Sequence, residues 1–168
     1  MLDKTSANNP LPEGAMAVGA GLLVLGLTAY GFLVISARAM GPERYASLSA
    51  LWALVFLAVP GFFFPVEQEV ARALSDRRAR GLGGAPVIRR VALASAALAG
   101  ALIVAGVAAS GPLTRRLFDD EPLLLASFLL ALAVYATSHL TRGMLSGNGQ
   151  FRPYGALLAW EGGARVVA

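Results

Sequence analysis

The 168-residue sequence contains no cysteine and only one histidine, and only 14% of its residues are charged. The absence of cysteine excludes disulfides, thiolate metal sites and thiol catalysis. A single histidine without acidic residues at ligand spacing argues against a metal site, so we expect no metal and no cofactor. An average soluble domain is about 25% charged. The low charge content therefore argues against an ordinary soluble fold.

Long uncharged runs fill most of the chain instead. Hydrophobic residues make up 57% of the sequence, and the mean hydropathy is +0.64. Four runs of 20 or more residues contain no Asp, Glu, Lys or Arg, and they occupy 14–37, 45–66, 91–114 and 122–141. A helix of about 20 residues crosses a hydrocarbon layer of about 30 Å. Because lipid offers no hydrogen-bond partner to the backbone, each run must be helical.

The sequence therefore predicts an all-α fold, a polytopic transmembrane helix bundle with four full spans and the start of a fifth. The fifth helix is expected over 153–168, since Pro153 suits a first helical turn. This segment is too short to cross a bilayer comfortably, so it is either an interfacial helix or a span cut off by the end of the chain, and we favour the second. We expect 1–13 to be a cytoplasmic tail and 14–168 to form the bundle. The first run is too long for a signal peptide, so we expect it to be retained.

The basic residues lie at the ends of the apolar runs and indicate the orientation. They form no patch with interleaved aromatic residues, so we expect no nucleic-acid partner. Nine of them fall on one side: Lys4, Arg72, Arg77, Arg78, Arg80, Arg89, Arg90, Arg142 and Arg152. Four fall on the other side: Arg38, Arg44, Arg115 and Arg116. The positive-inside rule thus predicts a multi-pass protein of the cell membrane, surrounded by lipid, with a cytoplasmic N-terminus.

Ionisable residues follow the second apolar run. Pro60 and Pro65 should kink this helix, and the helical pattern then continues through Glu67, Glu69 and Arg72. Glu69 and Arg72 are three residues apart and can pair on one helix face. One interpretation is a solvated helix end. The other is that Glu67 and Glu69 lie at the mouth of a polar cavity, where ionisable groups mark a substrate or ion path.

The fourth run carries a second candidate set. At 100° per residue, Tyr135, His139 and Arg142 fall within about 60° of one another, together with Phe128 and Ser146. This face either turns towards protein or water as part of a substrate path, or lies at the interface with Arg142 extended to the surface. The sequence leaves both interpretations open.

The expected fifth helix carries Glu161 and Arg165, four residues apart with the acid first, which favours a structural ion pair. No phosphate-binding loop, nucleophile elbow or pair of catalytic carboxylates can be placed in the sequence. We therefore expect that the protein is not an enzyme.

Short motifs resemble those of polysaccharide-biosynthesis flippases, which belong to the multidrug/oligosaccharidyl-lipid/polysaccharide exporter superfamily. Residues 39–45 resemble the LGPxxYG turn of these proteins, although Ala46 stands where the family often has glycine. Residues 70–72 resemble their "vaR" segment. The stretch between their fourth and fifth helices is matched by Arg142, Gly143, Gly147, Gly149, Phe151, Tyr154, Glu161 and Arg165. The resemblance covers most of the chain.

The resemblance implies transport of lipid-linked oligosaccharides, anchored by an isoprenoid diphosphate, across the membrane. Arg72 and Arg142 are then candidates for binding the diphosphate in a shielded cavity. Family members have 12 to 14 helices, so the partners would be the lipid-linked glycan and the missing C-terminal helices of the same protein. One alternative is a cation-coupled drug exporter of the same superfamily, with Glu67, Glu69 and His139 as proton sites. Another is a small, non-transporting membrane subunit that docks through its Gly and Ala faces.

Overall fold

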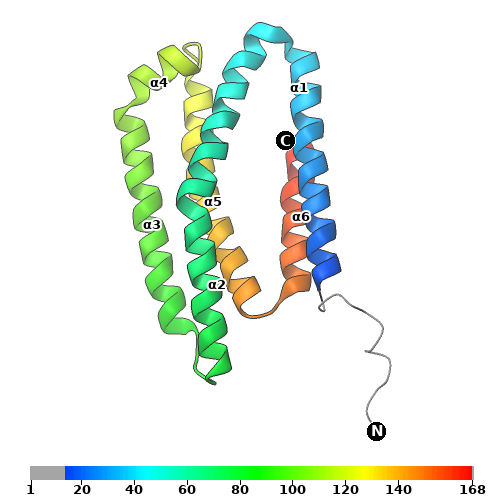
Figure 1. The fold of residues 1–168 in the computed structure, drawn as a ribbon. Coiled ribbons are helices and arrows are strands. Elements are labelled where there is room, and N and C mark those ends of the chain that lie inside the picture. The colour runs from blue at the N-terminus through cyan, green and yellow to red at the C-terminus, as the bar shows by residue number, and fades with distance from the viewer. Residues whose placement is uncertain (1–13, 168) are drawn as a thin grey trace. The chain divides into compact units, whose positions relative to one another are not determined.

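The computed structural model describes residues 14–167, which are 91% helical and contain no strand. This confirms the all-α class. The expected tail 1–13 lies outside the described residues. The elements in chain order are α1 (Ala15–Ala58), the π-helical turn η2 (Val59–Phe63), α2 (Phe64–Ala79), α3 (Ala85–Ala108), α4 (Ser110–Leu117), α5 (Pro122–Gly147) and α6 (Phe151–Val167) (Figure 1).

Within residues 14–167, three helical stretches are long and apolar enough to cross a membrane: Ala15–Ala79, Ala85–Ala108 and Pro122–Gly147. The chain thus has the character of a membrane protein, but the structure does not confirm the expected count of four full spans. The first stretch contains two of the four apolar runs. Its backbone leaves the helical region at Gly41, where φ is 75° and ψ is 171°, directly before Pro42.

Helix ends differ from the ends of the apolar runs. The helix expected at 91–114 begins earlier as α3, with Pro86 in its first turn, and ends at Ala108. Ala109 leaves the helical region, with φ of −89° and ψ of 11°, and α4 follows as a separate short helix. Helix α5 begins at Pro122 as expected but runs past Thr141 to Gly147. The apolar run marks the part that lipid tolerates, whereas prolines, turns and caps set the helix ends.

The predicted irregularity near Pro60 and Pro65 takes the form of η2. Proline lacks the backbone N–H of the regular helical pattern, and a π-helical turn accommodates the interruption. The turn directs Phe63 fully into the interior. Helix α2 then continues to Ala79, as the charge pattern predicted.

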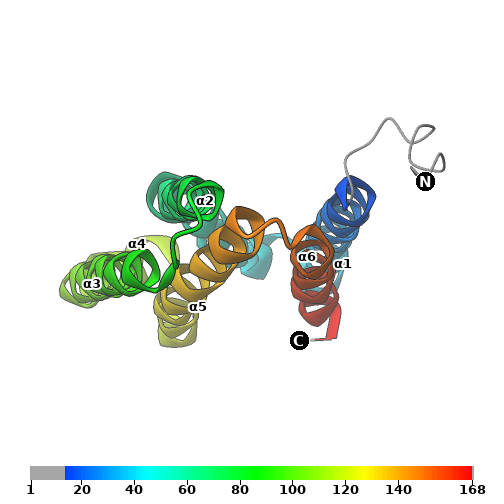
Figure 2. The same ribbon diagram turned by 90° about the horizontal axis from the view of Figure 1, so that it is seen from below.

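The chain divides into two compact units, and residues 35–148 form one of them. In this unit α5 lies alongside both α2 and α3 (Figures 1 and 2). Ser95 of α3 donates a hydrogen bond to the carbonyl of Ala136 on α5, with an Oγ–O distance of 3.4 Å. The core of this unit consists of Phe63, Ala99, Phe118, Phe128, Leu132 and Ala136. Helix α5 is therefore the central element of this unit.

Residues 1–34 and 149–168 form the other unit, of which 14–34 and 149–167 are described. Here α6 lies beside the first part of α1 (Figures 1 and 2). A Cβ built on Gly162 would lie 2.8 Å from Oγ1 of Thr28, and Gly21 meets the carbonyl oxygen of Gly155. Leu158 is buried between these small residues, at 1% exposure. Small residues let the two backbones approach closely, as in membrane helix pairs.

Candidate functional site

Two glycines bring α5 directly against α2. A Cβ built on Gly143 would lie 2.7 Å from the carbonyl oxygen of Glu67 and 2.8 Å from the Cβ of Val70. A Cβ on Gly147 would lie 2.8 Å from the carbonyl oxygen of Ala71. These distances leave no room for a side chain on α5, so the two backbones are in contact.

This close approach joins the histidine of α5 to an acid of α2. Nδ1 of His139 lies 2.7 Å from Oε2 of Glu67, and both residues are 5% exposed. An ionised carboxylate can only accept hydrogen bonds, so in that state Nδ1 carries a hydrogen and donates it to Glu67. Burying two ionisable groups is costly unless they are paired, and such groups inside membrane bundles commonly mark a functional site.

Aromatic rings surround the His139–Glu67 pair. The ring of Phe63 stacks on His139 with a centroid separation of 6.5 Å, and the ring of Tyr135 lies 6.2 Å away in a tilted arrangement. The second ring nitrogen, Nε2 of His139, is buried and has no hydrogen-bond partner among the described residues. Buried polar atoms nearly always have a partner, so an unsatisfied one calls for an explanation. Nε2 is the atom through which this pair can exchange a proton or bind a further polar group.

The structure thus brings together three of the candidate residues, Glu67, His139 and Tyr135. Arg142 lies about one helical turn further along α5 and is half-buried. Glu69 and Arg72 point elsewhere. Their predicted pairing is confirmed, with an Nη2–Oε1 distance of 2.8 Å, but the side chains are 54% and 70% exposed.

The exposed Glu69–Arg72 pair lies beyond the apolar run 45–66. Two hydrogen bonds from Arg72 hold the pKa of the Glu69 carboxyl below its ordinary value. This geometry matches a solvated helix end better than a cavity mouth. A role for Glu69 and Arg72 in a substrate path stays a prediction.

The buried side of α5 differs in direction from the face expected from the sequence. Two residues, Phe128 and His139, belong to both the expected face and the buried side. The other three residues of the expected face lie at the edge of the buried side: Tyr135, Arg142 and Ser146. At 100° per residue the centres of the two faces differ by about 60°. The buried positions are Phe128, Leu132, Ala136, His139, Gly143 and Gly147.

The pairing of Glu67 with His139 and the contact formed by Gly143 and Gly147 were not predicted from the sequence. A signal for the contact was present, because two glycines four residues apart are typical of closely packed membrane helices. No comparable signal existed for the pair, since the two residues are 72 positions apart on different helices.

Glu161 and Arg165 lie in the other unit, on α6, and both are half-buried. Their pairing with each other stays a prediction. Among residues 14–167, no group of three or more His, Cys, Asp or Glu side chains is arranged to hold a metal ion. The chemistry visible in the described residues is therefore acid–base and hydrogen-bond chemistry at Glu67 and His139.

In comparisons with known protein families, with curated proteins and with solved structures, no match to this chain was found. The function has to be argued from the sequence pattern and from the α2–α5 interface.

Proposed function

We propose that this chain belongs to a membrane transporter that moves lipid-linked oligosaccharide or polysaccharide precursors across the cell membrane, and that it is not an enzyme. The observation that carries the proposal is the buried pair of Glu67 and His139 between α2 and α5, directly after the apolar run 45–66 and within the apolar run 122–141. Ionisable groups facing the inside of a membrane bundle are costly and typically serve a substrate or ion path. The resemblance of the motifs at 39–45, 70–72 and 142–165 to flippases supplies the substrate class.

The buried pair favours a transporter over a docking subunit. Close packing of small residues, such as Gly143 and Gly147 against α2, is sufficient to hold membrane helices together. A purely structural interface of this kind gains little from an acid and an imidazole, because apolar residues of similar size usually stabilise it at least as well. The pair is therefore better explained by a function that needs it.

We further propose four membrane crossings before α6, with the N-terminus in the cytoplasm. The non-helical backbone at Gly41, followed by Pro42, supports a reversal between the apolar runs 14–37 and 45–66. The excess of Lys and Arg on the side of Arg77 and Arg90 supports the orientation.

Single-cysteine labelling tests this topology. Gly83→Cys should be protected from an impermeant thiol reagent in intact cells, and Gly111→Cys should react. Both positions have nothing within 4 Å of a built Cβ, so both cysteines should be tolerated. Residues 1–168 contain no cysteine, so they contribute no background labelling. The reverse labelling pattern, with Gly83→Cys reactive and Gly111→Cys protected, would overturn the orientation.

Arg142 is the best candidate for the diphosphate of the substrate. It is half-buried on α5, about one turn beyond His139, at the proposed cytoplasmic end where a lipid-linked sugar would enter. A guanidinium can form two parallel hydrogen bonds to phosphate oxygens, which an ammonium cannot match.

We therefore expect Arg142→Ala to abolish glycan export and Arg142→Lys to impair it, with equal amounts of both variants in the membrane. The measurement is surface glycan in cells that depend on this protein, beside a blot of the membrane fraction. If Arg142 only extends its charge to the surface, lysine should serve equally well. Full export by the alanine variant would remove Arg142 from the substrate path.

The second candidate function is a cation-coupled drug exporter. The unsatisfied Nε2 of His139 beside Glu67 favours it, because such a pair can take up and release a proton. The two functions separate in one comparison of cells with and without the protein. Loss of surface glycan with unchanged drug tolerance indicates the flippase, and the opposite result indicates the drug exporter.

A further inference from the structure

A groove lined by small residues runs between α3 and α5, on the side of α5 that does not hold the Glu67–His139 pair. Its volume is about 330 Å³, and its walls include Ala96, Ala99 and Gly100 of α3 and Ala133 of α5. A Cβ built on Gly100 would meet nothing within 4 Å, so the space beside this glycine is open. Ser95, the hydroxyl residue of α3 in the wall, is committed to a hydrogen bond with α5. Thr137 of α5, the other hydroxyl residue of the wall, donates to the carbonyl of Ala133, so the groove is mainly apolar.

The length of the groove matches one leaflet of a bilayer. On α3 its lining extends from Ala92 to Ile103. At 1.5 Å per residue this is about 16 Å, close to half of a hydrocarbon layer of about 30 Å. A second transmembrane helix would require a groove about twice as long. The length of the groove fits one acyl chain of a lipid that belongs to one leaflet of the membrane.

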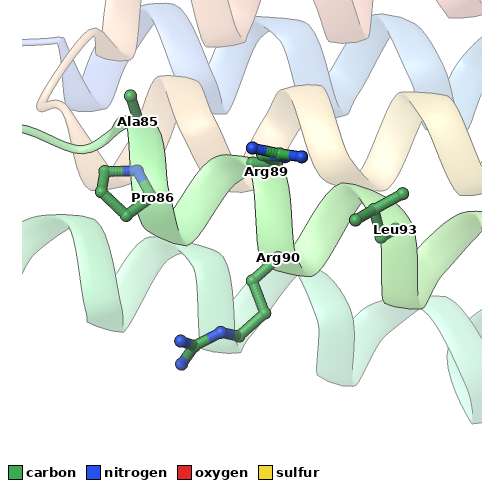
Figure 3. Close-up of a pocket in the computed structure, with 5 residues that line it drawn as sticks. All are labelled: Ala85, Pro86, Arg89, Arg90 and Leu93. Carbon is green, nitrogen blue, oxygen red and sulfur yellow. The ribbon is translucent and has the colours of Figure 1, made fainter.

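Positive charge lies at one end of this groove. Arg89 precedes Ala92 by three residues and falls within about 20° of Ala96 on the helical wheel, so it shares the face that lines the groove. Arg89 and Arg90 line a shallow hollow at the start of α3, of about 620 Å³, and their side chains leave the helix on different sides (Figure 3). Both are exposed, and neither forms a hydrogen bond or ion pair with any of the described residues 14–167.

We infer that the α3–α5 groove binds an anionic phospholipid, with one acyl chain between the two helices and the headgroup phosphate at Arg89. Cationic pockets between membrane helices at the cytoplasmic side are suited to anionic headgroups, and small wall residues leave room for a chain. The inference does not depend on which molecule is transported. Only the assignment to the cytoplasmic leaflet rests on the proposed orientation.

The test is native mass spectrometry of the purified protein in detergent, titrated with phosphatidylglycerol, with phosphatidylcholine of the same chains, or with inorganic phosphate. The wild type should bind one phosphatidylglycerol more tightly than phosphatidylcholine. Arg89→Gln should weaken phosphatidylglycerol binding about fivefold, since a basic residue near an anionic lipid surface contributes about 1 kcal/mol, whereas Arg90→Gln should weaken it less because Arg90 leaves α3 on another side (Figure 3). Phosphatidylcholine binding should change little.

Filling the groove tests the acyl-chain part separately. Gly100→Leu should weaken phosphatidylglycerol binding about tenfold by displacing about two CH₂ groups from the wall. Gly26→Leu is the matched control, since Gly26 is also a helical glycine with nothing within 4 Å but does not line the groove. Arg115→Gln with Arg116→Gln is the control for charge, because this exposed pair lies at the other end of the unit, on α4.

Three results would overturn the inference. Equal binding of phosphatidylglycerol by the wild type and by the Arg89→Gln variant would remove the headgroup site. Full competition by inorganic phosphate, with no effect of Gly100→Leu, would show a phosphate site without a chain. Equal losses of phosphatidylglycerol binding in the groove variants and in their controls would show that the lipid binds unspecifically around the protein. None of these results bears on glycan export, so they are distinct from a failure of the proposed function.

Discussion

Replacing His139 by leucine should destabilise the folded protein by about 3–5 kcal/mol, because it breaks the buried pair and removes the His139 hydrogen bond from the Glu67 carboxylate. Both residues are 5% exposed, so water does not readily replace that hydrogen bond. Glu67→Leu should cost less, about 1–3 kcal/mol, since it removes the Glu67 oxygen from Nδ1 of His139. The double variant should be close to the wild type, because two leucines pack between α2 and α5 without any buried charge.

Thermal unfolding in detergent measures all three variants, and the double-mutant cycle gives the coupling between the two positions. Arg72→Gln is the matched control, because it breaks an ion pair on the exposed face of the same helix. It should leave the unfolding temperature nearly unchanged. Additive effects of His139→Leu and Glu67→Leu would count against a direct interaction in the folded protein.

The second large effect is expected at Gly143. A methyl group there would lie under 3.0 Å from two atoms of α2, one of them the carbonyl oxygen of Glu67. Backbone atoms cannot move aside as a flexible side chain can, so Gly143→Ala should separate the helices and cost about 1–3 kcal/mol. Gly143→Leu should prevent α2 and α5 from packing at all.

Gly100→Ala is the control, and its effect on stability should have the opposite sign. Gly100 is also helical, but nothing lies within 4 Å of its built Cβ. Alanine has a higher helix propensity than glycine by about 1 kcal/mol, so this variant should be neutral or more stable. Unfolding temperatures of the two alanine variants in the same detergent make the comparison. Equal stability of Gly143→Ala and Gly100→Ala would contradict the close α2–α5 contact.

The sequence was sufficient for the helical class and for several local features. Uncharged runs of 20 or more residues can only be helical in lipid, which is why the all-α class was predicted correctly. The proline at 122 correctly marked the start of α5. The proline pair at 60 and 65 correctly indicated an irregular turn, seen as η2. The Glu69–Arg72 pair followed from a spacing of three residues on one helix. Each of these features depends only on residues close together in the chain.

Features that depend on how two helices pack against each other could not be predicted from the sequence alone. Glu67 and His139 were both candidate residues, but their pairing depends on how α2 and α5 are rotated about their axes. The direction of the α5 face differed by about 60° because Gly143 and Gly147 allow a contact that larger residues would prevent. The membrane-crossing count depends on the geometry at Gly41, where one residue interrupts a long helical stretch.

The central claim is that the Glu67–His139 pair serves transport and not only packing. The most direct measurement is surface glycan in cells whose only copy of the protein carries Glu67→Leu and His139→Leu together. This variant should be folded and present in the membrane at the wild-type amount, so a loss of glycan cannot be attributed to misfolding. The account predicts that the wild type restores surface glycan and the double variant does not. Full restoration by the double variant, or surface glycan that does not depend on the wild-type protein, would contradict it.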